Sequence, residues 1–221
     1  MSVKVNVTLE TVFHRILKSV PGEFVIGGYA YPELKGEDGS VIPDNGNDTF
    51  DLDALDESFV RMMSKESRRN FNADHSNVQI GEILPEYTDS DGLMWKSMVV
   101  KSPQPQYPRR GLFIVSRLFN DIAEGKKYIG LMKSGHKLSF SISGDALMRK
   151  TVCNDETCFN KVMAMDLFEI SSCDKGVNPE ARAFFMKSSE QPVAATLISL
   201  SSGGGSLLSL LESDCNGKMN E

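Results

Sequence analysis

The chain has 221 residues, enough for one substantial domain, and its 40% hydrophobic and 24% charged residues are typical of a globular protein. Lys and Arg number 24 against 30 Asp and Glu, so the net charge is −6 and no nucleic-acid partner is expected. No apolar run approaches membrane-spanning length, and the opening MSVKVNVTLE lacks the apolar core of a signal peptide. We therefore expect cytosolic synthesis and no membrane partner.

The four cysteines are Cys153, Cys158, Cys173 and Cys215. Because the cytosol is reducing, we expect thiols rather than a disulfide framework. A small zinc module built on Cys153, Cys158 and Cys173 is an alternative. Its C-x4-C spacing, with one further cysteine and no close histidine, is a poor match to known zinc sites.

The first half of the chain is predicted to hold several strands, a short helix before Pro21 and a longer helix after residue 50. Asp51 or Asp53 can cap this helix. Its apolar positions recur at helical spacing and are expected to pack in the core: Leu55, Phe59, Met62 and Met63. The other elements expected are an edge strand at 3–7, a short helix before Pro21, a buried strand at 24–31, a loop at 32–49, and a long β-hairpin of strands 78–84 and 93–100.

The second half of the chain is also mixed. The elements expected are an extended loop at 102–110, an amphipathic helix at 112–124 ending at Gly125, and strands at 137–142, 161–172 and 183–186. This order lacks regular βαβ alternation, so it predicts an α+β domain with a barrel-like, mostly antiparallel sheet and surrounding helices. The domain is expected to span 1–187, followed by a flexible Ser/Gly-rich tail at 188–221.

A serine hydroxyl is a weak nucleophile that needs a hydrogen-bonded base, usually a histidine, and the chain has three histidines. His14 has no companion motif and is expected on the surface. His136 begins a strand on which it should face away from Ser141, because side chains alternate along a strand. His75, after Asp74 in a turn, is the remaining candidate. The segment SFSISG, with Ser141 before Gly144, suits a nucleophile, although an exposed edge strand would show the same pattern.

Four short motifs follow one another in a particular order along residues 24–186. They are His75 followed by Val78–Glu82, the acidic turn Ser90–Leu93, the strand Leu138–Gly144, and Leu167–Ser171 followed by Val177–Ala181. Taken together, this order and spacing resembles the prohead maturation proteases of tailed bacteriophages, serine proteases that share the herpesvirus assemblin fold.

The resemblance implies that Ser141 is the nucleophile and His75 its base, with Ser139 on the same strand face as the backup nucleophile. It implies Glu169 as the third catalytic residue, with Asp166 as the alternative; Asp74 is a more remote candidate. Gly144 lets the backbone turn after Ser141, so backbone amides in that turn, around Ser143 and Gly144, are expected to form the oxyanion hole. Many relatives carry glycine or an acidic residue where this chain has Ser143. Arg149 could support that loop.

The same resemblance implies partners and place of action. The substrates would be phage scaffold and major capsid proteins, cleaved in the host cytoplasm inside the assembling prohead. No metal or organic cofactor is expected, and the protein could form a homo-oligomer. The competing interpretation is a noncatalytic phage structural or scaffold-associated protein with a protease-like fold.

The tail offers a site for self-processing. Some relatives cut after Glu with Leu or Ile two residues before it, and Leu210-Leu211-Glu212 fits this preference beside the Gly203–Gly205 linker. Self-cleavage after Glu212 is therefore expected to remove residues 213–221, while a chance Leu-x-Glu in a frayed terminus would look the same.

Overall fold

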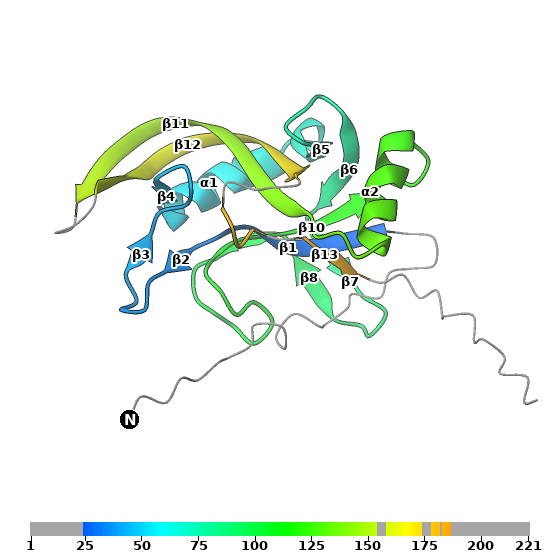
Figure 1. The fold of residues 1–221 in the computed structure, drawn as a ribbon, viewed down its shortest axis with the longest axis horizontal. Helices are drawn as coiled ribbons and strands as arrows, with labels where there is room; N and C mark the ends of the chain where they lie inside the picture. The colour runs from blue at the N-terminus through cyan, green and yellow to red at the C-terminus, as the bar shows by residue number, and fades with distance from the viewer. Residues whose placement is uncertain (1–23, 154–157, 174–177, 182, 187–221) are drawn as a thin grey trace, which may run out of the picture. The chain divides into compact units, whose positions relative to one another are not determined.

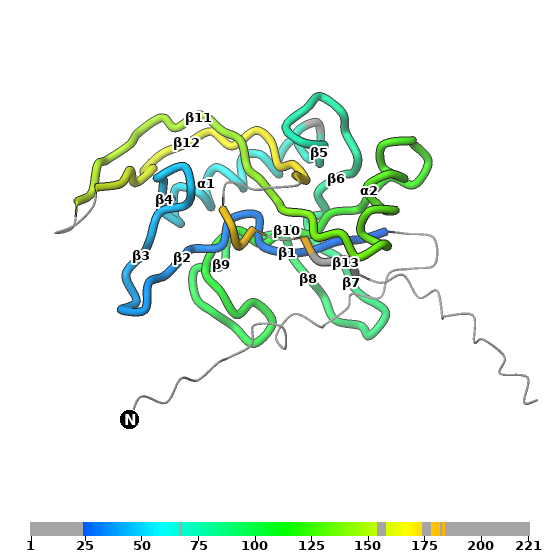
Figure 2. Tube along the Cα trace, in the orientation of Figure 1, coloured from blue at the N-terminus to red at the C-terminus, as the bar shows by residue number. Residues whose placement is uncertain are grey.

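The computed structural model describes residues 24–153, 158–173, 178–181 and 183–186. The described part is a mixed α+β fold built mostly from strands, in which a sheet curls into a half-barrel beside two α-helices (Figures 1 and 2). The broad α+β expectation is confirmed. The expectations for the first twenty residues, including His14, and for the tail with Glu212 lie outside the described residues.

The main sheet has the strand order β11-β12-β5-β6-β10-β1-β13, with β4 beside β12 and β9 beside β10. Its pairs are antiparallel except those of β12 with β4 and β5. The sheet strands are β1 Phe24–Pro32, β4 Asp48–Phe50, β5 Asn70–Ala73, β6 Gln79–Leu84, β9 Met98–Val100, β10 Gly111–Leu118, β11 Ser139–Cys153, β12 Cys158–Cys173 and β13 Phe184–Met186. Two small hairpins pair β2 Leu34–Lys35 with β3 Val41–Ile42, and β7 Glu86–Thr88 with β8 Met94–Lys96.

Helix α1, Leu52–Met63, forms where the sequence predicts it. The carboxylate of Asp51 caps it by accepting from the amides of Asp53 and Ala54 at 3.1 and 3.3 Å. Leu55, Phe59 and Met62 are buried as expected, and the helix packs against β12. A short 3₁₀ turn, Glu66–Arg68, then leads into β5.

The helix predicted at 112–124 is wrong. Residues Gly111–Leu118 form β10, and the second helix, α2, covers Ala123–Lys133. Leu112 and Ile114 belong to one buried apolar cluster, and Phe113 and Val115 belong to another. A strand with both faces covered has no polar alternation, so its continuous apolar run resembles the buried side of a helix. Gly125 lies in the first turn of α2, where an added Cβ would lie 1.8 Å from the Phe119 carbonyl oxygen.

The strands predicted at 78–84 and 93–100 form, as β6 and as β8 with β9, but the long hairpin expected between them is wrong. β6 and β9 pair one after the other along the same edge of β10, and the hairpin β7–β8 is inserted between them. Ser97 closes the gap: its hydroxyl donates to the Leu84 carbonyl at 2.6 Å and accepts from the Val115 amide at 2.8 Å. The loop expected at 32–49 contains the β2–β3 hairpin and the start of β4.

The long pair β11–β12 arches beside α1 (Figure 1). At one end of this pair, β12 also binds β5 in parallel, which brings the loop after β5 beside the start of β11. No helix in the described ranges is long and apolar enough to cross a membrane.

The double burial of β10 makes its side chains a test of the fold. Ile114 is fully buried, so Ile114→Ala should lower the free energy of unfolding by about 2–5 kcal/mol through lost packing and a cavity. The control Val60→Ala changes a residue of α1 that is 60% exposed and should alter it by about 0.5 kcal/mol or less. Urea titration followed by circular dichroism measures both, and equal small effects would contradict a central β10.

Candidate active site

Ser141 lies on β11 and faces the same side of the sheet as Ser139 and Ser143. Its neighbour Phe140 points to the opposite side, where it is fully buried and packs edge-on against Phe71 of β5, with ring centroids 5.7 Å apart. This anchor fixes which way Ser141 points. Ser141 itself is only 6% exposed.

His75 lies in the turn that follows β5. Its Nε2 atom is 2.7 Å from the Ser141 hydroxyl oxygen, and its side chain is 37% exposed. The structure therefore brings together the two residues, 66 positions apart, that the sequence predicted to meet. A neutral imidazole that accepts at Nε2 can take the serine proton, which is the arrangement required of an activated nucleophile.

Cross-strand pairing builds a polar surface around this contact. Ser141 lies opposite Ser171 of β12, and Ser171 lies beside Asn72 of β5, so these side chains form one row across the sheet. In the next row, Ser143 lies opposite Glu169. The roles of Asn72 and Ser171 were missed in the sequence, although strand alternation gives a signal for both.

The other ring nitrogen of His75, Nδ1, has two polar neighbours. The Ser143 hydroxyl is 2.8 Å away, at hydrogen-bond distance, and Glu169 Oε2 is 3.8 Å away, at ion-pair distance. Glu169 Oε1 accepts from the Ser171 hydroxyl and from Asn72 Nδ2, the latter at 3.3 Å, which holds this carboxylate in place. The Glu169 side chain is only 16% exposed, so its charge is less screened than a surface charge.

The alternative acidic residues lie elsewhere. Asp166 Oδ1 is 3.6 Å from Arg68 Nη1, and Asp166 lies opposite Asp145 on β11. Asp74 accepts a hydrogen bond from the Tyr128 hydroxyl at 2.7 Å. Glu169 is therefore the acidic residue that the geometry favours as the partner of His75. His136 lies between α2 and β11, where its backbone amide donates to the Leu131 carbonyl.

The expected turn after Ser141 is wrong. β11 continues to Cys153, with register shifts between Ser143 and Gly144 and on either side of Met148 instead of a turn. A Cβ on Gly144 would lie 2.7 Å from the Asp166 carbonyl oxygen, so glycine is needed for close approach to β12 and not for a turn. Ser143 instead directs its hydroxyl at His75, a contact that its shared face with Ser141 could have predicted.

A cavity of about 210 Å³ adjoins this site. Ser141, Ile142 and Gly144 contribute to its wall from β11, and Arg149 lies farther along the same strand. The remaining lining residues are Ala30, Tyr31, Asp44, Gly46, Asp48, Phe50, Phe140, Ala146, Val162, Met165 and Asn178. Arg149 Nη2 is 3.8 Å from Asp48 Oδ2, so Arg149 approaches the Asp48 carboxylate in the cavity wall instead of supporting a turn beside Ser143.

Two groups in this wall have raised pKa values. Burial raises the pKa of Tyr31 to about 12, so its hydroxyl stays protonated at neutral pH. Burial also raises the pKa of the Asp44 carboxyl, although the amides of Asp48 and Gly46 that donate to it act in the opposite direction. The cavity thus combines apolar walls with several hydrogen-bonding groups.

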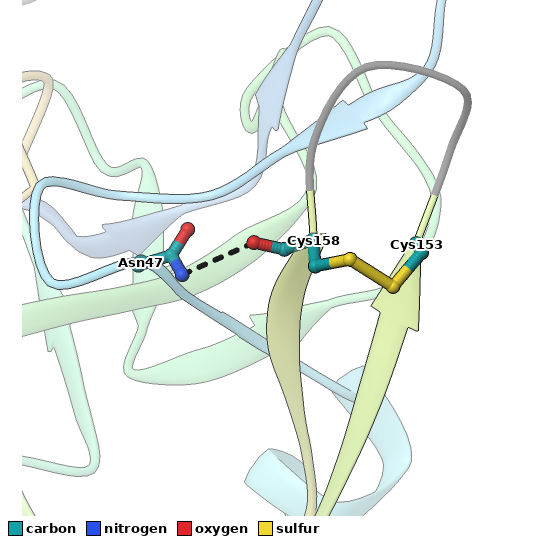
Figure 3. Close-up of a disulfide and its surroundings, with 3 residues drawn as sticks. All are labelled: Asn47, Cys153 and Cys158. Carbon is teal, nitrogen blue, oxygen red and sulfur yellow. Dashed lines mark hydrogen bonds between the residues drawn. A yellow bond between two sulfur atoms is a disulfide. The ribbon is translucent and has the colours of Figure 1, made fainter.

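The expectation that all the cysteines are thiols is wrong for two of them. Cys153 and Cys158 are cross-strand partners at the tip of the β11–β12 pair and form a disulfide (Figure 3). Their Cα atoms are 4.0 Å apart because the strands end in register there, which the spacing alone did not reveal. The Asn47 side chain donates to the Cys158 carbonyl at 3.2 Å.

The zinc alternative has no support among the described residues. Cys173 is buried in β12 and does not take part in the disulfide, and Cys215 lies outside the described residues. No group of three or more His, Cys, Asp or Glu side chains in the described ranges could hold a metal ion.

A scan against models of known protein families and a search of curated proteins found no match for this chain.

The two acidic residues of β12 can be separated by experiment. Glu169→Gln should slow the reaction of Ser141 with a fluorophosphonate by about 10- to 100-fold, because the charge beside His75 is lost while Ser143 still holds the ring. Asp166→Asn, which removes a charge of the same sign from the same strand, should react like the parent protein. Mass spectrometry of the labelled protein gives the rates. Parent-like rates for both variants would exclude an acidic third residue from this strand.

Proposed function

We propose that this protein is a serine endopeptidase that cleaves scaffold and capsid proteins during the maturation of a bacteriophage prohead. The observation that carries the proposal is the 2.7 Å contact between His75 Nε2 and the Ser141 hydroxyl. Glu169, on the far side of the imidazole, completes a Ser-His-acid arrangement. The phage assignment, and the assemblin-like form of the fold, rest on the order and spacing of the sequence motifs.

In the proposed reaction Ser141 Oγ attacks the carbonyl carbon of a peptide bond while His75 Nε2 takes the hydroxyl proton. The carbon–nitrogen bond then breaks, and His75 gives the proton to the departing amine. Water attacks the resulting ester with His75 again as base, which releases the carboxylate product and restores Ser141. The positive charge that His75 carries in both steps is stabilised by Glu169.

An extended substrate has a place to bind beside Ser141. β11 is an edge strand of the sheet, and only its beginning is covered, where the Phe140 amide donates to Ala181 and the Ala183 amide donates to Leu138. No strand of the described residues pairs with this edge beyond Phe140. A peptide could add there as a further strand, with a side chain in the neighbouring cavity.

The oxyanion would be stabilised by backbone amides, for which Ser143 and Gly144 remain the candidates. The pairing is irregular at this point, because the register shift between them leaves Phe168 of β12 without a partner on β11. Backbone amides that face the substrate at such a site can bind a developing negative charge.

Loss of the nucleophile tests the proposal directly. Ser141→Ala should lower cleavage of scaffold or capsid protein by at least about 10⁴-fold, because the attacking oxygen is removed. Ser139→Ala is the matched control, since this serine lies on the same face of β11, and it should retain activity. Purified variants are incubated with the candidate substrates, and the fragments are identified by mass spectrometry. A parent protein that cuts none of them and leaves Ser141 unreacted with fluorophosphonate would favour a noncatalytic structural role.

Self-processing gives a second test. We propose that the active enzyme cuts after Glu212 and removes residues 213–221. Intact-mass measurement should show the shortened chain in active protein and the full chain in Ser141→Ala, and Glu212→Gln should block the cut. Active protein with an unchanged C-terminus would exclude this site.

A further inference from the structure

The backbone at the proposed catalytic histidine has an unusual conformation. Asp74 and His75 are consecutive residues with φ angles of 46° and 53°, in the left-handed region that side chains other than glycine seldom occupy. This conformation folds the chain back after β5 and carries the imidazole to Ser141. Two adjacent residues of this kind persist only where surrounding contacts hold them.

Backbone contacts supply part of this support. The Asp74 amide donates to the Ser172 carbonyl of β12 at 2.8 Å, and the Ser76 amide donates to the Ala73 carbonyl at 2.8 Å. The Ser76 hydroxyl donates to the same Ala73 oxygen. These bonds fix the start and the end of the turn, and they leave the Asp74 side chain to bind elsewhere.

That side chain connects the turn to helix α2. The Tyr128 hydroxyl donates to Asp74 Oδ2 at 2.7 Å. Tyr128 is only 4% exposed, and its helix neighbours Ile129 and Met132 are buried in the same apolar cluster. Gly125 brings α2 into close contact with the backbone of Phe119. The tyrosine is thus a fixed donor, because packing holds both its ring and its helix.

We propose that Tyr128 and Asp74 are positioning residues that hold His75 in line with Ser141. They act through the turn and do not touch the substrate. This inference rests on the proposed function, since it concerns the reactivity of Ser141. It also assigns α2, which carries none of the reacting groups, a part in that reactivity.

Tyr128→Phe removes one hydroxyl and tests the inference. It should slow fluorophosphonate labelling of Ser141 by about 10- to 100-fold, the range expected for losing one hydrogen bond to a charged group. Tyr107→Phe is the matched control. Tyr107 belongs to the other apolar cluster and is equally buried, at 4% exposed, and its hydroxyl accepts a hydrogen bond from the Lys96 amide. This control should label at the parent rate.

Substitutions of Asp74 separate its two contributions. Asp74→Asn keeps an acceptor oxygen and a residue that tolerates the left-handed conformation, so it should keep most of the labelling rate. Asp74→Gly keeps the conformation without the acceptor and should match Tyr128→Phe. Asp74→Ala loses both and should be the slowest. Thermal unfolding of each variant identifies any that fail to fold.

A second measurement does not depend on activity. The ¹⁵N NMR shifts of the His75 ring report its tautomer and its hydrogen bond at Nε2, and they should change in Tyr128→Phe and not in Tyr107→Phe. Parent-like labelling and parent-like ring shifts in folded Tyr128→Phe would overturn the inference while leaving the protease intact. If Ser141 fails to label in the parent protein, the protease proposal fails, and the ring shifts alone decide whether Tyr128 positions His75.

Discussion

Strand β12 is hydrogen-bonded along both edges at one end, antiparallel to β11 and parallel to β5, and the whole site depends on this double pairing. It sets Ser141, Ser171 and Asn72 in one row and Ser143 opposite Glu169. Side chains alternate with a period of two, so a slip of one residue in either pairing would turn one member of the site into the core. The apolar residues between the polar ones resist such a slip, because Phe140, Phe71 and Ile170 are each fully buried on the other face.

The paired strands β5 and β12 support the strained turn at Asp74 and His75. Left-handed conformations at Asp74 and His75 cost about 1–3 kcal/mol each, whereas a single hydrogen bond contributes about 1 kcal/mol net. No one contact offsets that cost, so the turn must be held by several at once. The hydrogen bonds of Asp74 with Ser172 and with Tyr128 connect the turn to β12 and α2 at residues that are themselves buried. The strained backbone at Asp74 and His75 is thereby held by contacts from two separate elements, β12 and α2.

The sequence predicts the parts of this fold that obey a simple period or cap. Helix α1 follows from Asp51 and the spacing of Leu55 and Phe59. The meeting of His75 and Ser141 is confirmed, although it depended on a family resemblance as well as on strand alternation. β10 was not predictable in the same way, because burial on both faces removes the alternation that marks a strand.

Other features depend on contacts that no local pattern shows. The disulfide requires that β11 and β12 end in register at Cys153 and Cys158. The hydrogen bond from Tyr128 to Asp74 joins residues 54 positions apart, and the left-handed backbone beside it is carried by residues other than glycine. The pairing of β6 and β9 with one edge of β10 depends on a serine hydroxyl that replaces a backbone partner. Each is a tertiary constraint that overrides the local signal.

The two neighbours of His75 Nδ1 differ in when they act. When Nε2 accepts from Ser141, Nδ1 carries the ring proton and donates to the Ser143 hydroxyl at 2.8 Å, which fixes the ring and its tautomer in the resting state. Glu169, 3.8 Å from the same nitrogen, is too distant to compete for that proton. In the proposed reaction, the charge of Glu169 matters most once His75 has taken the serine proton and become a cation. An interaction that strengthens on the way to the transition state raises the rate, while one that is constant serves only to orient. In the proposed mechanism, Ser143 and Glu169 therefore divide between them the two tasks that a single carboxylate performs in a Ser-His-Asp triad.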